Sequence, residues 1–434
     1  ELLLAIGRCP GPDRPGLTQA MATRLGLRCD PWADEDGQAL PPSDQAWLEG
    51  QGVERARRVA DAVAWLERQA STLIQRLIEP EHFDEVAGQA LHPDLERWLL
   101  DGSDPSLLHL KQTLIPRLRA CADRERAGFL HAMAGGRIAS GPSGAPTRGR
   151  PDVLPTGRNF FSVDLRGLPT EAAWDLGRRS AEQLLELYLL EEGEPLRHLA
   201  LSVWGTATMR NGGEDIAQML ALMGVRPVWD GPTRRLVDLE VIPLALLQRP
   251  RVDVTLRISG LFRDAFPQLV RWVDRALALV AGLEEDAHAN LLAARSRERG
   301  RPPRVFGSAP GAYGAGLQTL IDSGQWEEQG DLADAFLSWS RWAYDGQGEP
   351  QEDREGLERS LSEVQVVLHN QDNREHDLLD SDDYYQFQGG LAAAVTAVRG
   401  RPAALWFADH SRRERLRLND RKRRASTASE DAAR

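Results

Sequence analysis

The chain has 434 residues, with 53 Lys and Arg against 65 Asp and Glu, and its formal net charge is -12. This acidic balance argues against nucleic acid as a partner, because phosphate binding needs a basic face. No apolar run approaches the roughly 18 residues of a membrane span, and no signal peptide is recognisable. The cysteines Cys9, Cys29 and Cys121 form no C-x-x-C pair and leave an odd thiol. We therefore expect a reducing cytoplasm, no membrane and no thiolate metal site.

Residues 1–134 are predicted to form a mainly helical region. Apolar side chains recur there at helical spacing, as at Val59, Val63 and Leu66 and again at Leu73 and Leu77. The chain starts at Glu1, without an initiator methionine and within a predicted element. We expect it to be a piece of a longer protein. Residues 135–157 are rich in Gly, Pro, Ser and Arg, which predicts a domain linker or a loop that orders on a ligand.

Residues 158–285 alternate between helical and strand patterns. Helices are predicted over 170–190, 213–223 and 264–280, and strands over 199–204, 225–229, 236–242 and 252–258. Strands separated by helices imply parallel pairing, so we predict a layered α/β domain with a largely parallel sheet. Such domains place their ligands beyond the carboxyl ends of the strands.

The rest of the chain is predicted to contain a connector, a site region and a tail. Charged residues and proline interrupt the pattern over 286–303. Residues 304–411 form a mixed α/β region, with helices over 332–344 and 357–368 and a strand over 404–407. Residues 412–434 turn basic and then small and polar, which is typical of a disordered tail.

The most distinctive stretch is HNQDNREHDLLDSDDYYQFQGG, which covers 369–390. Its imidazoles and carboxylates are ligand types that Co²⁺, Ni²⁺ or Zn²⁺ accept. The candidate metal ligands are His369, Asp372, Glu375, His376 and Asp377, and the two histidines are also candidate catalytic bases. We expect a loop entered from the preceding helix. The alternative is that the acids cap helices and the histidines pack on tyrosines.

Three further segments are candidates for substrate binding. Arg210 and Asn211 follow the strand predicted over 199–204, where α/β sites form. Arg257 lies at the end of another strand, although ion pairing of Arg257 with Asp253, and of Arg263 with Asp264, is an equally good interpretation. Tyr313 lies in the glycine-rich run RVFGSAPGAYGAGL and could stack on a flat ring, unless this run is only a tight turn.

Neither a P-loop nor a dinucleotide fingerprint is present in the chain. No nucleotide site is therefore expected here. If the reaction is driven by ATP, another subunit must hydrolyse the nucleotide.

From about Leu154 to Ser411 the chain resembles the C-terminal half of the CobN and magnesium-chelatase H-subunit family. The matching stretches are PTGRNFFSVD, LSVWGTATMRNGGEDIAQMLALMGVRPVWD, RPRVDVTLRISGLFRDAFPQ, RVFGSAPGAYGAGL and HNQDNREHDLLDSDDYYQFQGG. The last stretch favours the cobalt branch. The resemblance implies the large subunit of a cytoplasmic, ATP-dependent cobaltochelatase. Such a subunit binds cobalt and hydrogenobyrinic acid a,c-diamide during cobalamin synthesis, and works with an AAA+ ATPase subunit and a further chelatase subunit.

This resemblance assigns His369 and His376 as cobalt ligand and proton acceptor, in either order, with Asp372, Glu375 and Asp377 as metal-guiding carboxylates. Two alternatives stay open. One is a magnesium-type subunit that acts on a porphyrin. The other is a truncated, non-catalytic module that binds a tetrapyrrole.

Overall fold

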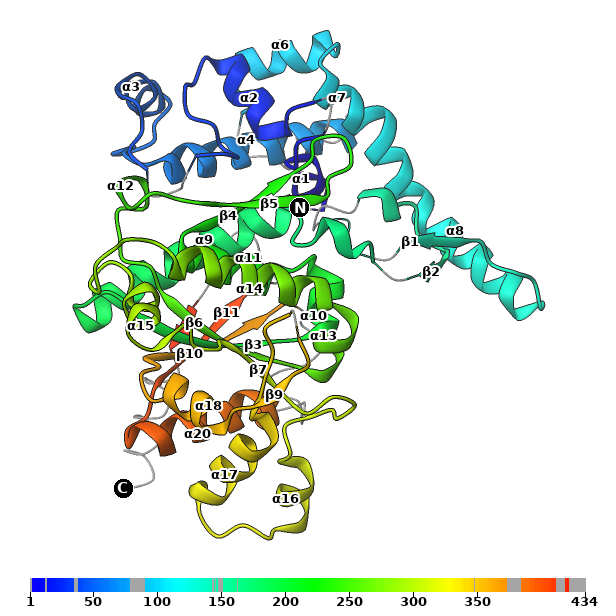
Figure 1. The fold of residues 1–434 in the computed structure, drawn as a ribbon. Coiled ribbons are helices and arrows are strands. Elements are labelled where there is room, and N and C mark those ends of the chain that lie inside the picture. Colours follow the sequence, from blue (N-terminus) through cyan, green and yellow to red (C-terminus); the bar gives the residue numbers. More distant parts are fainter. Residues whose placement is uncertain are drawn as a thin grey trace, which may run out of the picture. The chain divides into compact units, whose positions relative to one another are not determined.

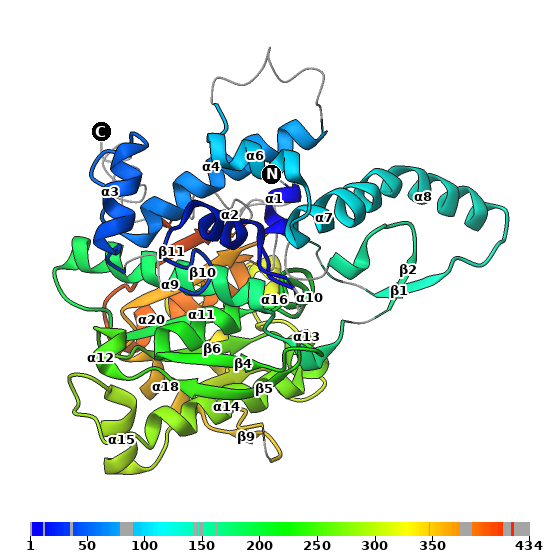
Figure 2. The same ribbon diagram turned by 90° about the horizontal axis from the view of Figure 1, so that it is seen from above.

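The computed structural model describes residues 2–11, 14–34, 38–78, 90–142, 144, 146, 151–161, 163–346, 348–372, 384–410 and 418–420. The chain divides into two compact units, Glu1–Val163 and Asp164–Arg434. Figures 1 and 2 show the elements of both units in two orientations. No helix in the described ranges is long and apolar enough to cross a membrane.

The first unit is helical, as its periodicity predicted. Its helices are α1 (Leu2–Gly7), α2 (Leu17–Leu25), α3 (Pro42–Gly50), α4 (Val59–Ile78), α6 (Pro93–Asp101), α7 (Pro105–His109) and α8 (Ile115–Met133), with a π-helical turn at Leu110–Leu114. Strands β1 (Ser140–Pro142) and β2 (Asn159–Phe161) pair in parallel.

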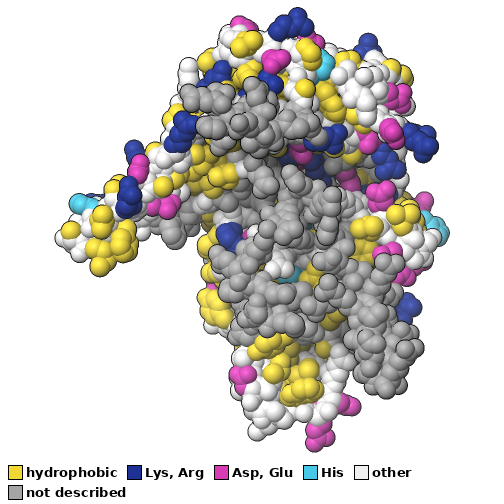
Figure 3. Space-filling model, turned by 180° about the vertical axis from the view of Figure 1, so that it is seen from behind, with side chains coloured by type: hydrophobic (Ala, Val, Ile, Leu, Met, Phe, Trp, Pro, Cys, Tyr) yellow, Lys and Arg dark blue, Asp and Glu magenta, His cyan; other side chains and the backbone are white. Residues whose placement is uncertain are grey.

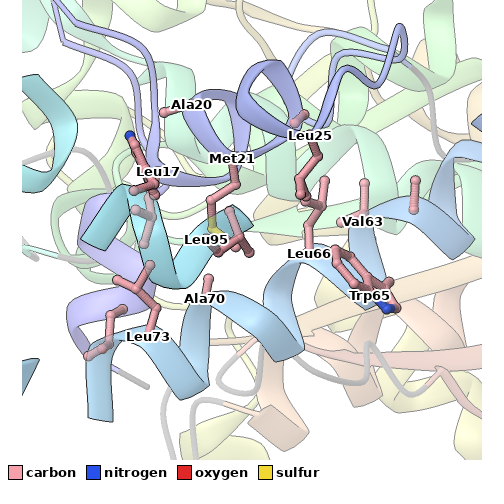
Figure 4. Packing of buried hydrophobic residues seen from close by; sticks show 14 of the residues in the cluster. Leu17, Ala20, Met21, Leu25, Val63, Trp65, Leu66, Ala70, Leu73 and Leu95 are labelled. Atoms are coloured by element: carbon pink, nitrogen blue, oxygen red, sulfur yellow. The ribbon is translucent and has the colours of Figure 1, made fainter. Parts of the chain in front are cut away.

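The core of this unit forms where α2, α4 and α6 meet. Met21 from α2, Leu66 and Leu73 from α4, and Leu95 from α6 are all fully buried (Figure 4). Burying each such side chain contributes about 1.5–3 kcal/mol. Helix α8 differs from the helices of this core, because its C-terminal half is exposed. Its last turns carry Phe129, Leu130 and Met133, which are more than half exposed, and hydrophobic side chains gather at this end of the helix in Figure 3.

The second unit is built on an eight-stranded sheet of order β12-β11-β10-β3-β6-β7-β8-β9. Its parallel strands are β11 (Ala404–Asp409), β10 (Val366–Gln371), β3 (His198–Val203), β6 (Asp253–Ile258) and β7 (Val305–Gly307). The edge strands β8 (Trp342–Ala343), β9 (Gln351–Glu352) and β12 (Leu418–Asp420) are antiparallel. The prediction of a largely parallel α/β layer is confirmed.

Helices cover both faces of this sheet (Figure 1). One face carries α9 (Glu171–Glu192), α11 (Glu214–Met223) and α14 (Pro267–Ala281), and the other carries α17 (Gln329–Ser340), α18 (Arg354–Leu361) and α20 (Gly390–Arg399). Shorter helices α10 (Gly205–Asn211), α12 (Leu244–Leu247), α13 (Gly260–Ala265), α15 (Leu291–Arg299) and α16 (Gln318–Ser323) complete the unit.

The strands predicted over 225–229 and 236–242 are present as β4 (Val225–Trp229) and β5 (Leu236–Val241), but the parallel pairing expected for them was wrong: they form a separate antiparallel pair. Two predicted helices were also wrong in detail. The helix predicted over 264–280 is two helices, because Pro267 starts α14 directly after α13. The helix predicted over 357–368 ends at Leu361, and β10 follows. The segment 366–371 begins with the buried residues Val366, Val367 and Leu368. Because of these apolar side chains, the segment pairs with β3 and β11 in the sheet and does not extend the helix.

The strand order reverses between β3 and β10. From β3 the chain moves outward to β6 and β7 and then returns to the other side of β3 for β10 and β11. Right-handed crossovers in opposite directions place helices on opposite faces and open a crevice at the carboxyl ends of the two strands. The topology therefore places the candidate site beyond Val203 and Gln371.

A buried ion cluster joins the opposite, amino-terminal ends of the strands. The Asp253 carboxylate accepts two 2.6 Å hydrogen bonds from Arg304 and one of 3.1 Å from Arg295. These guanidinium groups hold the pKa of Asp253 far below its usual range, although burial acts to raise it. The cluster is structural, and the neighbouring His198 is buried with it.

Candidate functional site

Polar and aromatic side chains meet where the strand order reverses. Trp204 directly follows β3, Asp372 directly follows β10, and His410 directly follows β11. Strand alternation sends successive β10 side chains to opposite faces of the sheet. Val367 joins the hydrophobic cluster of α18 and α20, so His369 lies on that face, whereas Asn370 bonds to α11 on the other. The site therefore has two parts, one on each face of the sheet, at the carboxyl ends of the strands.

His369 is buried within an aromatic cluster. Its ring centroid lies 4.9 Å from that of Tyr384, 5.7 Å from that of Phe407 and 6.5 Å from that of Trp204. Only 1% of the residue is exposed, and neither ring nitrogen has a hydrogen-bond partner among the described residues. Burial lowers the pKa of His369 to about 4, and the nearby Asp372 carboxylate offsets only part of this effect. His369 is therefore a neutral imidazole at physiological pH, with an uncommitted lone pair.

Asp372 is paired with Arg210. The guanidinium donates two hydrogen bonds to the carboxylate, 2.9 Å from Nη2 to Oδ1 and 3.2 Å from Nε to Oδ2. The Asp372 side chain is 6% exposed, whereas that of Arg210 is 48% exposed. The structure thus brings a predicted metal ligand together with a predicted ring contact, in one bidentate pair.

The side chain of Asn211 binds the backbone at the start of α11. Its Oδ1 accepts hydrogen bonds from the backbone N–H groups of Gly213 at 2.9 Å and Glu214 at 3.2 Å. These contacts satisfy amides at the start of α11, which would otherwise lack partners. Asn211 is 3% exposed, so its side chain orients the start of α11.

Arg257 is a buried cation beneath the glycine-rich loop. It donates 2.9 Å hydrogen bonds to Ser340 Oγ and to the Gly314 carbonyl, and its guanidinium carbon lies 4.7 Å from the ring centroid of Phe387. No carboxylate in the described ranges lies within ion-pair distance of it, and burial lowers its pKa to about 9. The expected pair with Asp253 is absent from this part of the structure, because Asp253 binds Arg304 and Arg295.

Tyr313 is 59% exposed on the same loop. Its hydroxyl donates a 2.6 Å hydrogen bond to Asp264, and its ring lies 5.5 Å from the guanidinium carbon of Arg263. The ion pair between Arg263 and Asp264 is present, with a 2.6 Å contact. One face of an exposed aromatic ring is thus held in a fixed position beside the carboxyl ends of β6 and β7.

A continuous buried hydrogen-bond network occupies the α11 side of the site. His410 Nδ1 lies 3.0 Å from Glu214 Oε2, and His410 Nε2 lies 2.9 Å from Ser180 Oγ on α9. Gln218 donates to Ser180 Oγ at 2.8 Å. Asn370 Nδ2 then donates to Gln218 Oε1 at 2.6 Å. The order of groups is that of a Ser-His-Glu triad, but Ser180 is 1% exposed and accepts from Gln218, so it is not placed to attack a substrate.

Asp215 joins this network through Asn370, whose Nδ2 donates to Asp215 Oδ1 at 2.8 Å. Burial raises the pKa of Asp215 to about 7. The neighbouring Asp372 and Glu214 carboxylates act in the same direction, while the hydrogen bond from Asn370 and the proximity of His410 oppose it. Asp215 is therefore a buried acid that exchanges a proton near neutral pH.

Glu375, His376 and Asp377 lie outside the described residues. Within the described ranges, no three His, Cys, Asp or Glu side chains converge as ligands for one metal ion. The described part of the predicted ligand set is His369 and Asp372.

Sequence reasoning missed the network. His410 carried a usable signal, because it is a polar residue shortly after the strand predicted over 404–407. Asn370 carried none of this kind, because the helix predicted over 357–368 hid the strand that positions it. Glu214 and Asp215 gave little signal, because acidic residues are common in the first turn of a helix. Ser180 gave no signal, since a serine within a long helix usually faces solvent or its own backbone.

The chain is similar to known proteins along most of its length. The model of the CobN/Magnesium Chelatase family matches residues 1–430. The aerobic cobaltochelatase subunit CobN of Pseudomonas aeruginosa is 47% identical over 438 residues, which cover 96% of this chain and 34% of that protein. The magnesium-chelatase H-subunit of Cereibacter sphaeroides is 35% identical over 301 residues, which cover 67% of this chain and 25% of that protein.

A solved structure agrees with this relationship. The catalytic subunit of cobaltochelatase from Mycobacterium tuberculosis superposes with a TM-score of 0.67 at 38% sequence identity, covering 96% of this chain and 34% of that one. The chain spans about a third of the length of these cobaltochelatase relatives. With the family model matched along nearly all of its length, the chain belongs to the CobN/magnesium chelatase family.

Proposed function

We propose that the chain forms the metal-binding and part of the ring-binding site in the large subunit of an ATP-dependent cobaltochelatase. Its substrates would be Co²⁺ and hydrogenobyrinic acid a,c-diamide, and its reaction would belong to cobalamin biosynthesis. The higher identity to the CobN protein, 47% against 35% for the magnesium-chelatase relative, supports cobalt over magnesium. The single observation that carries the proposal is the buried, neutral imidazole of His369 at the strand reversal, which has no hydrogen-bond partner in the described ranges.

We assign His369 as a metal ligand rather than as the base. A group whose pKa is about 4 holds a proton poorly at neutral pH, but its nitrogen lone pair is available to a divalent ion. An imidazole binds cobalt without the strong retention of a thiolate, so the ion can pass on to the ring. Asp372 would supply a carboxylate, and Arg210 would keep that carboxylate in place until the ion arrives.

The inner nitrogens of the ring must lose two protons when the metal enters. Of the predicted residues, His376 stays the proposed proton acceptor. Asp215 is a second candidate, because its pKa of about 7 matches the ideal for a base that works near neutral pH. Glu375 and Asp377 would guide the ion electrostatically.

The ring would lie over the glycine-rich loop. Tyr313 presents an exposed aromatic face there, and the charge of Arg257 has no acidic counter-ion among the described residues. A buried positive charge favours an anionic group nearby, such as an acetate or propionate on the ring edge. Arg210 would release or share its contact with Asp372 if it also binds the ring.

ATP would be hydrolysed by a partner AAA+ subunit, because the chain contains no P-loop sequence. A further chelatase subunit would complete the assembly. We place the reaction in the cytoplasm, in keeping with the sequence pattern of the cysteines.

The test is a titration of the chain with hydrogenobyrinic acid a,c-diamide, followed by ring absorbance and tryptophan quenching, and then addition of Co²⁺. We expect micromolar ring binding by the parent, and loss of cobalt binding in His369→Ala with ring binding retained. His288→Ala, at an exposed histidine in the same unit, is the matched control. Protoporphyrin with Mg²⁺ tests the magnesium alternative. Failure of the parent to bind the ring would reject this assignment of the site.

A further inference from the structure

The side-chain amide of Asn370 has only one orientation that fits its neighbours. On one side it meets the Asp215 carboxylate and the Gln218 carbonyl oxygen, at 2.8 and 2.6 Å. The Gln218 carbonyl oxygen accepts hydrogen bonds, and so does the Asp215 carboxylate in its ionised form, so the NH₂ of Asn370 must face them. Both amide protons are then used, and Oδ1 is directed elsewhere. This oxygen is buried and has no partner among the described residues.

The network behind Asn370 fixes this orientation through a chain of donors. The Glu214 carboxylate can only accept, so His410 Nδ1 carries the proton of their 3.0 Å contact. The Ser180 hydroxyl oxygen accepts from the Gln218 NH₂, so its own proton is directed to His410 Nε2, 2.9 Å away. The Gln218 carbonyl is left facing Asn370. Reversing any one amide would set two acceptors or two donors against each other.

An acceptor left open in this position selects the chemistry of its ligand. It can bind an N–H group, but a carboxylate has no proton to donate. The acids Glu214 and Asp215 begin α11 on the same side of the sheet, so a second anion would also be repelled. The Asn370 oxygen is therefore suited to a neutral donor such as a primary carboxamide.

We propose that Asn370 Oδ1 recognises a primary carboxamide on the edge of the tetrapyrrole, and that Gln218, Ser180 and His410 are positioning residues that hold it in the accepting orientation. This inference rests on the proposed function. It assigns a place where the amidated ring is distinguished from the same ring bearing carboxylates.

The experiment measures the ratio of the dissociation constants for hydrogenobyrinic acid and its a,c-diamide with the 434-residue chain. A lost hydrogen bond that leaves a buried polar group unpaired weakens binding by about 10- to 100-fold. We expect the parent to prefer the diamide by that factor. Asn370→Leu should bring the ratio close to one, mainly by weakening diamide binding.

The positioning role is tested at Ser180. Ser180→Ala breaks the donor chain and should reduce the ratio, whereas Ser180→Thr keeps a hydroxyl and should restore it. Ser296→Ala is the matched control, because Ser296 is also a helical serine, its hydroxyl bonding to the Leu292 carbonyl at 2.7 Å. Thermal unfolding of each variant is compared first. This pair keeps the proposal testable if Asn370→Leu fails to fold.

The outcomes separate this inference from the proposed function. Diamide preference that survives both Asn370→Leu and Ser180→Ala overturns the inference and leaves the proposed function standing. Equal affinity of the parent for the two rings does the same. Absence of any ring binding by the parent overturns both. Loss of preference in Asn370→Leu and Ser180→Ala, with recovery in Ser180→Thr, supports the inference.

Discussion

The buried histidine His198 should make the second unit sensitive to mild acid. It lies on β3 with 1% of its surface exposed, and its Nε2 is 3.0 Å from Thr255 Oγ1. Burial lowers its pKa from 6.5 to about 3; the nearby Arg304 and Arg295 charges act in the same direction, and Asp253 opposes them. His198 therefore stays neutral in the fold under conditions that protonate it in the unfolded chain.

The sign and size of the effect follow from proton linkage. Above a pH of about 6.5 neither state binds the proton, and stability is unaffected by this group. Below that value the unfolded chain gains a proton that the folded chain does not, so stability falls by about 1.4 kcal/mol for each pH unit. Between about pH 7.5 and 5 the loss is about 2 kcal/mol, and it reaches about 4 kcal/mol near pH 3.

The assay compares the parent with His198→Gln by pulse proteolysis in urea, reading the fragment that contains β3 and β6. The substitution removes the titrating group. The difference in the free energy of unfolding between parent and variant should therefore change by about 2 kcal/mol between about pH 7.5 and pH 5. His288→Gln, at an exposed position, is the control and should parallel the parent. If the His198→Gln curve also ran parallel to the parent, the assigned neutral state of His198 would be wrong.

Three further substitutions test the packing and the site. Gly177→Ala would place its Cβ 2.6 Å from the backbone nitrogen of Gln218. The overpacking cost of about 1–3 kcal/mol should exceed the helix-propensity gain of about 1 kcal/mol, so the variant should be less stable than the parent. A higher free energy of unfolding in urea would contradict this prediction. Arg304→Met should lower the free energy of unfolding by about 3–5 kcal/mol because it leaves the Asp253 carboxylate buried with weaker pairing, and a double-mutant cycle with Asp253→Asn should show coupling. Asp372→Asn should weaken cobalt binding. It should change the free energy of unfolding by less than about 1 kcal/mol, because its partner Arg210 is half exposed. Unchanged cobalt affinity by calorimetry would remove Asp372 from the ligand set.

The sequence by itself determined the fold class and most of its elements. The apolar strands at 199–204 and 252–258 and the helix ended by Gly224 were predicted almost to the residue, because burial on both faces and a left-handed C-terminal glycine leave clear local signals. The roles of His369 and Asp372 as metal ligands stay predictions, and the structure places His369 within a buried aromatic cluster.

Local pattern could not determine which strands pair. The chain segment 366–371 follows a helix directly, and only pairing with β3 and β11 decides that it is a strand. The same pairing separates His369 and Asn370 onto opposite faces, which no helical or loop model of the segment would have predicted.

Tertiary structure also decided the chemistry of individual groups. Burial gives His369 a pKa of about 4 and Asp215 one of about 7, reversing the ordinary order of histidine and aspartate. His410, Ser180 and Glu214 lie far apart in sequence and meet only because β11, α9 and α11 pack around one strand end. Desolvation and long-range hydrogen bonding depend on what surrounds a side chain, and the sequence states only what the side chain is.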